Sequence, residues 1–181
     1  VGSPTSQGPF AMPDYYFELR RAQTAALTAA ADVLADVARR FETVSGRSLS
    51  ACEPYRLEGA RKAIVALVSS AGTVKDVVDE LRDEGELVGL LKIRSFRPFP
   101  SEVAALLGAL DEVIVLDRAD SPGGAPPLAA EVAFALGWLR PTLRTHVYGL
   151  GGRDLHPADV RDIFAGVAPR YVGLREAECH V

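Results

Sequence analysis

The sequence predicts an open α/β domain, in which a mostly parallel sheet is covered by helices on both faces. Three short apolar runs rich in branched residues, Ala63–Val68, Val88–Ile93 and Glu112–Leu116, are typical of strands buried on both faces. Helical patterns alternate with these runs along the chain. Two strands joined by a helix must lie parallel with a right-handed crossover, so this alternation favours helices on both sides of one sheet.

The best-defined segment runs from Lys62 to Pro100 and reads as strand, turn, helix, turn, strand. Its helix is predicted from one apolar stripe formed by Val74, Val77, Val78 and Leu81. The charged residues on the other side are expected to face solvent, namely Lys75, Asp76, Asp79 and Glu80. Gly85 sits where a left-handed helix stop belongs.

The N-terminal part has a different character. Residues 1–13 carry Gly, Pro and Ser without any period and are interpreted as a linker. Residues 14–46 show apolar residues at steps of three and four, which predicts a helix of roughly thirty residues, about 45 Å long. That length exceeds what one small sheet can cover, so we expect an arm that reaches another domain or subunit. The alternative is a helix that bends around its own domain.

The remaining elements complete an α/β domain over residues 53–166. A short extended piece is expected at Glu53–Leu57, and a helix opens at Pro100 or Ser101. After a Pro- and Gly-rich loop, Leu128–Leu139 is predicted to be helical, Leu143–Tyr148 an edge strand and Pro157–Gly166 the last helix. Residues 167–181 are interpreted as a polar C-terminal tail.

Composition excludes several classes of function. A chain of 181 residues with a net charge of −4 has no basic footprint for nucleic acid. No apolar run approaches the ~20 residues that cross a bilayer, and no signal-peptide pattern is present, so we expect a cytoplasmic protein without membrane contact. Cys52 and Cys179 are isolated, which predicts no metal site and free thiols in a reducing compartment. The chain starts without Met, as if it were part of something longer.

Ligands of open α/β folds bind at the carboxyl ends of the strands, so candidate sites are expected there. The first is the turn Ser69–Thr73, where Ser70, Gly72, Thr73 and backbone N–H groups could hold an anion such as phosphate. It lacks the GxGxxG pattern and an acidic residue for a ribose, and it lacks a GxSxG elbow. Simple capping of the helix by a hydroxyl is the alternative.

Basic residues around the second strand form the next candidate. Lys92 and Arg94 share one face of that strand, and Arg97 follows it. Cations on a central strand suggest a face that its own helices leave uncovered, turned toward carboxylates, phosphates or a neighbouring domain. The alternative is snorkelling, with buried stems and solvated head groups.

The glycine-rich segment Gly149–Asp154 is the third candidate. It resembles half of a dinucleotide fingerprint but follows the last strand, so a tight turn that presents Arg153 and Asp154 to an interface is favoured. The histidines at 146, 156 and 180 are scattered, and none pairs with an obvious nucleophile or acid. The residues alone therefore predict no self-contained active site.

Four segments in order, PDYYFELRRAQ, AIVALVSSAGTVKDVVDELRDEGELVGLLKIRSFRPFP, VIVLDR and YGLGGRD, resemble one region of the 2-oxoacid:ferredoxin oxidoreductases. The likeness covers nearly the whole chain. It is strongest to the domain that follows the pyrimidine-binding domain in the alpha part of pyruvate:ferredoxin oxidoreductases. RSFRPFP and GLGGRD resemble the pyruvate and branched-chain members more than the 2-oxoglutarate members.

The resemblance implies a three-layer α/β/α sandwich similar to the transketolase C-terminal domain, preceded here by the long helix. Its sheet has five strands and is mostly parallel, with a first strand, here Glu53–Leu57, that runs antiparallel. The parent enzymes oxidatively decarboxylate a 2-oxoacid to acyl-coenzyme A with thiamine diphosphate, magnesium and iron–sulfur clusters. Those cofactors belong to other parts, so the resemblance implies no catalytic residue and no cofactor in this chain. It implies partners: pyrimidine-binding, diphosphate-binding, gamma and ferredoxin-type domains or subunits.

Three hypotheses follow. The leading one is a non-catalytic structural and interaction domain of a thiamine-dependent oxidoreductase acting on a 2-oxoacid, with pyruvate favoured. The second is a small nucleotide- or coenzyme-A-binding protein that uses the Ser69–Thr73 turn with Arg94 and Arg97. The third is a free-standing assembly factor, which would co-purify with a partner while binding no small ligand.

Overall fold

The computed structural model describes residues 12–139 and 141–174, and the chain divides into two compact units. The first unit is Val1–Leu49 and the second is Ser50–Val181.

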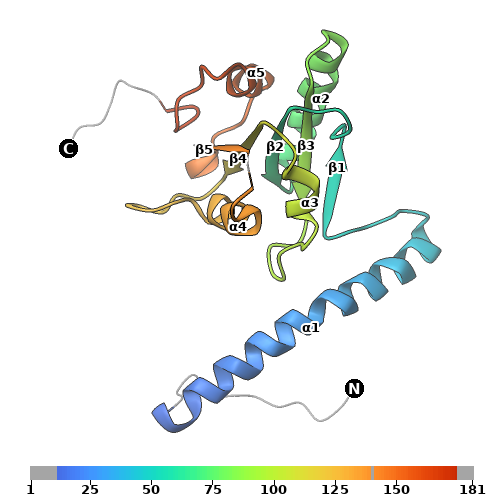
Figure 1. Ribbon diagram of the computed structural model, residues 1–181, viewed down its shortest axis with the longest axis vertical. Helices are drawn as coiled ribbons and strands as arrows, with labels where there is room; N and C mark the ends of the chain where they lie inside the picture. The colour runs from blue at the N-terminus through green and yellow to red at the C-terminus, as the bar shows by residue number, and fades with distance from the viewer. Residues whose placement is uncertain (1–11, 140, 175–181) are drawn as a thin grey trace. The chain divides into compact units, whose positions relative to one another are not determined.

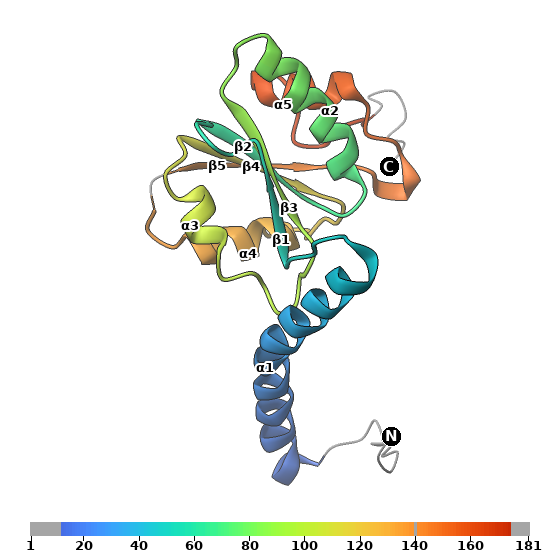
Figure 2. The same cartoon turned by 90° about the vertical axis from the view of Figure 1, so that its right-hand side faces the viewer.

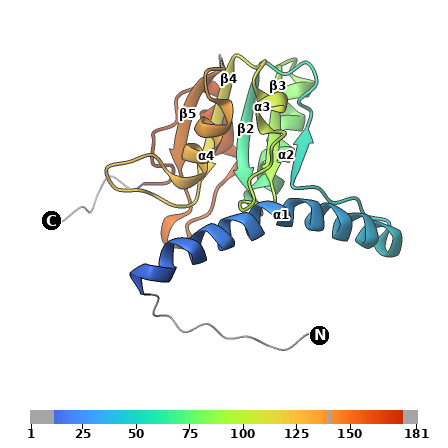
Figure 3. The same ribbon diagram turned by 60° about the horizontal axis from the view of Figure 1, so that its bottom comes forward.

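The second unit is built on a five-stranded sheet with the spatial order β1-β3-β2-β4-β5 (Figure 1, Figure 3). The strands are β1 (Cys52–Tyr55), β2 (Lys62–Leu67), β3 (Val88–Ile93), β4 (Glu112–Asp117) and β5 (Thr142–Val147). All neighbouring pairs are parallel except β1 and β3, which are antiparallel. The predicted mostly parallel five-stranded sheet is confirmed, and the extended piece predicted at Glu53–Leu57 is its antiparallel edge strand, which the structure places at Cys52–Tyr55.

Helices form a layer on each face of the sheet (Figure 2). These helices are α2 (Ser70–Asp83), α3 (Val103–Leu107), α4 (Pro127–Leu136) and α5 (Pro157–Ala165). Alternate residues of each strand point to opposite faces. In β2, Ile64 packs into the core cluster that holds α2 and α5, while Ala63 and Val65 pack with α3 and α4. The three-layer α/β/α sandwich is therefore confirmed.

Local chemistry explains most of the element ends. Gly85 has φ +93°, a left-handed conformation that the residue after a helix often needs and that glycine adopts without strain. Helix α4 ends at Leu136, three residues earlier than the sequence predicts, because Gly137 leaves the helical region. Trp138, which falls within the predicted range Leu128–Leu139, instead lies in the turn that follows the helix.

The first unit contains the long helix α1 (Pro13–Ser45). Pro13 occupies its first turn and Gly46, with φ +68°, ends it by donating its N–H to the Glu42 carbonyl. Its 33 residues correspond to about 50 Å. An apolar stripe that includes Leu19, Val33 and Phe41 runs along it, and residues 12–49 hold no second element that could bury this stripe.

The segment after α5 returns to the sheet. The Val147 N–H donates to the Arg170 carbonyl, and Val172 N–H donates to the Val147 carbonyl. Val172 is buried beside the α2/α5 core cluster. The domain limits predicted at residues 53–166, with a linker at 1–13 and a tail at 167–181, stay predictions. Residues 1–11 and 175–181 lie outside the described part of the chain.

Candidate functional site

The carboxyl ends of the four parallel strands meet at one edge of the sheet, which we name the C-edge. Leu67 pairs with Ile93 and Asp117 pairs with Val147, so the ends of β2, β3, β4 and β5 lie in register there. Because β1 runs the other way, its first residue, Cys52, faces Ile93 at the same edge. The loops at the C-edge hold most of the candidate residues named from the sequence.

The predicted anion turn is occupied by contacts within the chain. Ser70 is buried, and its hydroxyl donates to the Leu67 carbonyl at 3.1 Å. Ser69 precedes α2 in a helical conformation and its side chain caps no N–H group. Gly72 is exposed with free space around its Cα, and Thr73 is half-buried. The helix start thus leaves little polar side-chain chemistry pointing outward.

The basic residues of β3 face α2, and they have an acidic neighbour on β1. Glu53 lies directly opposite Lys92 in the antiparallel register. Its carboxylate accepts from Lys75 of α2 at 2.5 Å and from the Arg94 guanidinium. The hydrogen bond from Lys75 is the largest cause that lowers the pKa of Glu53 below its usual value, and Arg94 and Lys92 add to it. Of the predicted cations, Arg94 therefore pairs with one of the chain's own carboxylates and Lys92 lies opposite it, whereas Arg97 does not join this cluster.

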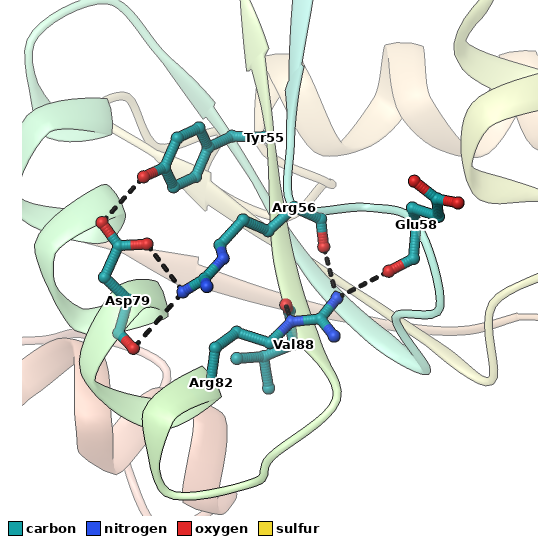
Figure 4. Close-up of polar contacts among 6 residues, drawn as sticks. All are labelled: Tyr55, Arg56, Glu58, Asp79, Arg82 and Val88. Atoms are coloured by element: carbon teal, nitrogen blue, oxygen red, sulfur yellow. Dashed lines mark hydrogen bonds and ion pairs between the residues drawn. The ribbon is translucent and has the colours of Figure 1, made fainter.

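Further polar contacts join α2 to β1 and to the residues that follow β1, and we name this set of contacts the β1–α2 seam (Figure 4). Asp79 accepts from the Tyr55 hydroxyl at 2.7 Å and from Arg56 at 2.8 Å. The Arg82 guanidinium donates to the carbonyls of Val88 and Glu58 at 2.6 and 3.0 Å, and to that of Arg56. Lys75 and Asp79, expected on the solvent side of α2, are half-buried here. The seam fastens the antiparallel edge strand to the sandwich.

A glycine makes that attachment possible. A Cβ atom at Gly89 would lie 2.8 Å from the Arg56 carbonyl oxygen and 2.9 Å from the Leu57 side chain. The chain leaving β1 therefore crosses β3 at a point where only a hydrogen fits. This close approach explains why a glycine interrupts the apolar run of β3.

In the α3 and α4 layer, charged side chains contact α4. Arg97 pairs with Glu131 of α4 at 2.5 Å and lies over the Phe96 ring, with 4.4 Å from guanidinium carbon to ring centre. Asp117, at the end of β4, is buried and accepts from the backbone N–H groups of Leu128 and Ala129 at 3.0 and 2.9 Å. Burial raises the pKa of the Asp117 carboxyl, while the two N–H donors oppose that rise. Its carboxylate closes the start of α4.

Arg153 is an exposed candidate at the opposite side of the sheet from β1. Its guanidinium donates to the Gly173 carbonyl at 2.6 Å, beside a shallow, open depression of about 470 Å³ that Tyr148, Leu150 and Tyr171 help to line. Gly149 and Gly151 have positive φ, so the glycine-rich segment forms the tight turn that was favoured for it. The structure thus places Arg153 away from the Glu53 cluster, at the end of β5.

Two buried titratable groups lie near these loops. His146 of β5 is buried, and its Nδ1 lies 2.8 Å from the Pro169 carbonyl oxygen. Burial lowers the pKa of this imidazole. Burial also raises the pKa of the Cys52 thiol, as expected of an unreactive cysteine. Among residues 12–139 and 141–174, no set of three or more His, Cys, Asp or Glu side chains is arranged to hold a metal ion.

Sequence reasoning missed Glu53, Lys75 and Asp117, the residues that organise these contacts. For Asp117 a signal existed, because an acidic residue closes a strand and a Pro-Pro helix start follows ten residues later. For Glu53 no local signal exists, since its partners lie on other elements.

Within the described ranges no helix has both the length and the apolar character needed to cross a membrane.

Comparisons with known proteins agree with this architecture. The chain is 45% identical over 184 residues to the pyruvate synthase subunit PorA of Thermotoga maritima, covering 96% of this chain and 47% of that protein. It is 36% identical over 165 residues to the ketoisovalerate oxidoreductase subunit VorA of Pyrococcus abyssi, covering 89% and 42%. The chain thus spans about half the length of the PorA relative and somewhat less of the VorA relative.

A solved structure has the same fold. It is the 2-oxoglutarate:ferredoxin oxidoreductase from Magnetococcus marinus with 2-oxoglutarate, coenzyme A and succinyl-CoA bound, which matches with a TM-score of 0.51 and 19% identity over 70% of this chain and 21% of that chain. Residues 60–160 match the model of the family described as pyruvate:ferredoxin oxidoreductase core domain II. This range contains β2 through the start of α5, and the chain belongs to that family.

Proposed function

We propose that this chain is a non-catalytic structural and interaction domain of a thiamine-diphosphate-dependent 2-oxoacid:ferredoxin oxidoreductase. The assembled enzyme would oxidise a 2-oxoacid, with pyruvate favoured, to acyl-coenzyme A. Membership in the family and the names of the relatives support the enzyme class. PorA and VorA are named as subunits, which supports the presence of further subunits.

The non-catalytic role is inferred from the hydrogen bonds at the C-edge, where the polar side chains bind other parts of the same chain. Ser70 serves the Leu67 carbonyl, Glu53 is held by Lys75 and Arg94, and Asp117 caps α4. Groups that would otherwise bind a substrate or move a proton are engaged in holding elements together. The polar chemistry of this edge therefore favours a framework role.

The cofactors are proposed to lie in other parts of the enzyme. An iron–sulfur cluster uses about four thiolates, and this chain has 2 cysteines, so its own residues do not fit a cluster. Thiamine diphosphate and magnesium are assigned to the pyrimidine- and diphosphate-binding domains, with the clusters in ferredoxin-type partners. The assembled enzyme is proposed to be cytoplasmic.

Two surfaces are proposed to contact those companions. The apolar stripe of α1 needs a partner outside its own unit, so we assign the arm to another domain or subunit. Exposed Arg153, beside its open depression, is assigned to an interface with an acidic surface. Three of the other predicted anion or interface candidates remain in this proposal as contacts around the C-edge: Gly72, Thr73 and Lys92. The other three already form hydrogen bonds within the chain: Ser70, Arg94 and Arg97.

Calorimetric titration tests the proposal. Thiamine diphosphate with Mg²⁺ is expected to give no binding heat with this chain, and an assay with pyruvate, coenzyme A and ferredoxin is expected to show no turnover. Turnover by the chain alone would refute the proposal. Coenzyme A as a second titrant addresses the nucleotide-binding alternative, which the comparisons do not favour: micromolar binding lost on Arg97→Ala would support that alternative.

A further inference from the structure

The chain that follows α5 lies against the outer edge of β5, and we name residues 169–174 the strap. The Val147 N–H donates to the Arg170 carbonyl at 2.7 Å, and the Val172 N–H donates to the Val147 carbonyl at 2.8 Å. Just before the strap, the Ala168 N–H donates to a carbonyl of α5 at 3.2 Å. The strap can therefore leave β5 while α5 keeps its own contacts.

Few contacts hold the strap in place. The Tyr171 hydroxyl donates to the Asp120 carboxylate at 3.2 Å, and Arg153 donates to the Gly173 carbonyl at 2.6 Å. Val172 is buried, whereas the other strap residues are exposed. A segment with one buried side chain and mostly exposed hydrogen bonds opens at a smaller free-energy cost than the whole domain.

A buried histidine lies beneath the strap. His146 is 4% exposed, and it shares a face of β5 with Tyr148, which belongs to the α2/α5 core cluster. Its Nδ1 lies 2.8 Å from the Pro169 carbonyl oxygen. Because a carbonyl oxygen only accepts, Nδ1 carries the hydrogen and Nε2 keeps a lone pair. Nε2 is buried and has no hydrogen-bond partner among the described residues.

The surroundings of His146 disfavour its charged form. Protonation places a second N–H at the buried Nε2, where the described residues offer no acceptor. Arg144 of β5 repels the charge, and Glu112 of β4, which attracts it, is already paired with Arg144. The helices above this face bury no charged side chain. The charged residues of α5 and of the strap are exposed or bonded elsewhere: Asp159, Arg161, Asp162 and Arg170.

We propose that the strap is a pH-dependent switch, which lies closed over neutral His146 and opens when this side chain takes up a proton. Opening gives both ring nitrogens access to water, so the imidazolium gains the partners that it lacks in the closed form. It also breaks the contact between Arg153 and Gly173, which frees the Arg153 guanidinium beside its depression. Histidine is the side chain whose charge ordinarily changes between pH 5 and pH 8. The inference does not depend on the proposed function.

Amide hydrogen exchange of the full chain between pH 8 and pH 5 tests the switch, with rates corrected for the intrinsic pH dependence of exchange. The Val172 N–H reports on the strap, and the Val65 N–H of the central strand β2 reports on global unfolding. With an open-state imidazole that titrates near pH ~6.5, protection of Val172 should fall by up to about 25-fold between pH 7 and pH 5. Val172 should exchange faster than Val65 at every pH.

Substitutions assign the effect to one histidine. His146→Gln cannot titrate and should remove the pH dependence of Val172 protection. His156→Gln, at an exposed position, and His180→Gln, beyond the described residues, are the matched controls and should keep it. Tyr171→Phe loses the hydrogen bond of its hydroxyl, so it should lower Val172 protection by about 2- to 10-fold at every pH while the pH dependence stays.

Circular dichroism of each variant shows whether the fold is intact. Protection of Val172 that does not change with pH in the wild-type chain overturns the proposal. A pH dependence that survives His146→Gln, or that either control variant also removes, overturns it as well. Equal exchange rates of Val172 and Val65 contradict it too, because the strap would then open only when the whole domain unfolds.

Discussion

The two helical layers of this sandwich share one sheet but differ in what they show to the outside. The α2 and α5 layer is charged on its outer side, where Arg161 of α5 reaches Glu80 of α2 and Glu84, the residue just after α2, each at 2.8 Å. The α3 and α4 layer exposes Phe134 and Trp138 instead. Each layer packs a cluster of buried apolar side chains against the sheet. One layer therefore presents charged side chains to solvent, whereas the other presents an apolar surface of the kind that usually contacts another protein.

The largest expected effect separates the inside of the apolar layer from its outside. Leu128 is fully buried, so Leu128→Ala should lower the free energy of unfolding by about 2–5 kcal/mol through lost burial and a residual cavity. Phe134→Ser, on the same helix, should change it by no more than about 0.5 kcal/mol, because the Phe134 side chain is exposed. Urea unfolding of both variants measures the contrast. Equal losses would mean that Phe134 supports the fold.

The next effect concerns the way each layer is attached. Asp117→Ala removes the acceptor for the Leu128 and Ala129 N–H groups and should cost about 1–2 kcal/mol, with Asp117→Asn costing less because an amide oxygen can still accept. Since these contacts are buried, the loss should be the same at low and high salt. A loss that disappears in salt would show that Asp117 acts through long-range charge instead.

The α5 side should respond to pH through His146. Burial is the main cause that lowers the pKa of its imidazole, the nearby Arg144 lowers it further, and the Pro169 carbonyl and Glu112 oppose the shift. The unfolded chain therefore takes up a proton below pH ~6.5 that the folded chain refuses, so stability falls as pH drops from there through the folded pKa. The slope is at most about 1.4 kcal/mol per pH unit.

Chemical denaturation between pH 8 and pH 5 measures this slope. His146→Gln, which cannot titrate, should flatten the curve in that window. An unchanged slope in the variant would assign the pH dependence to other groups.

The smallest effect is expected at the charged outer surface. Arg161→Ala removes contacts to Glu80 and Glu84 that are exposed to solvent, so the denaturation midpoint should shift slightly at low ionic strength and not at ~1 M salt. Arg161→Lys is the matched variant and should retain part of the shift. A large shift of the denaturation midpoint that persists at ~1 M salt would show that these contacts contribute more than screened surface attraction.

The sequence predicts the elements well because each carries its own local signal. The bounds of β3 agree with the structure, and Val74, Val77, Val78 and Leu81 of α2 are all buried as their spacing predicts. The antiparallel edge strand follows only from the family resemblance, because four residues containing a proline give no strong strand pattern.

The site was harder to predict because its contacts join distant parts of the chain. Arg94 looks unpaired in the sequence, but its partner Glu53 lies 41 positions away and faces it only through the β1–β3 pairing. Phe134 and Trp138 read as ordinary helix residues, because an apolar period cannot tell a side that meets the sheet from a side that meets another molecule.

The central claim is that the apolar layer is a contact surface, and Trp138 reports on it directly as the single tryptophan of the chain. The chain labelled with 5-fluorotryptophan should be titrated with a soluble paramagnetic agent, first alone and then within the assembled enzyme. We predict that the Trp138 ¹⁹F signal broadens freely in the chain alone and is strongly protected in the assembled enzyme. Equal broadening in both states would contradict the account.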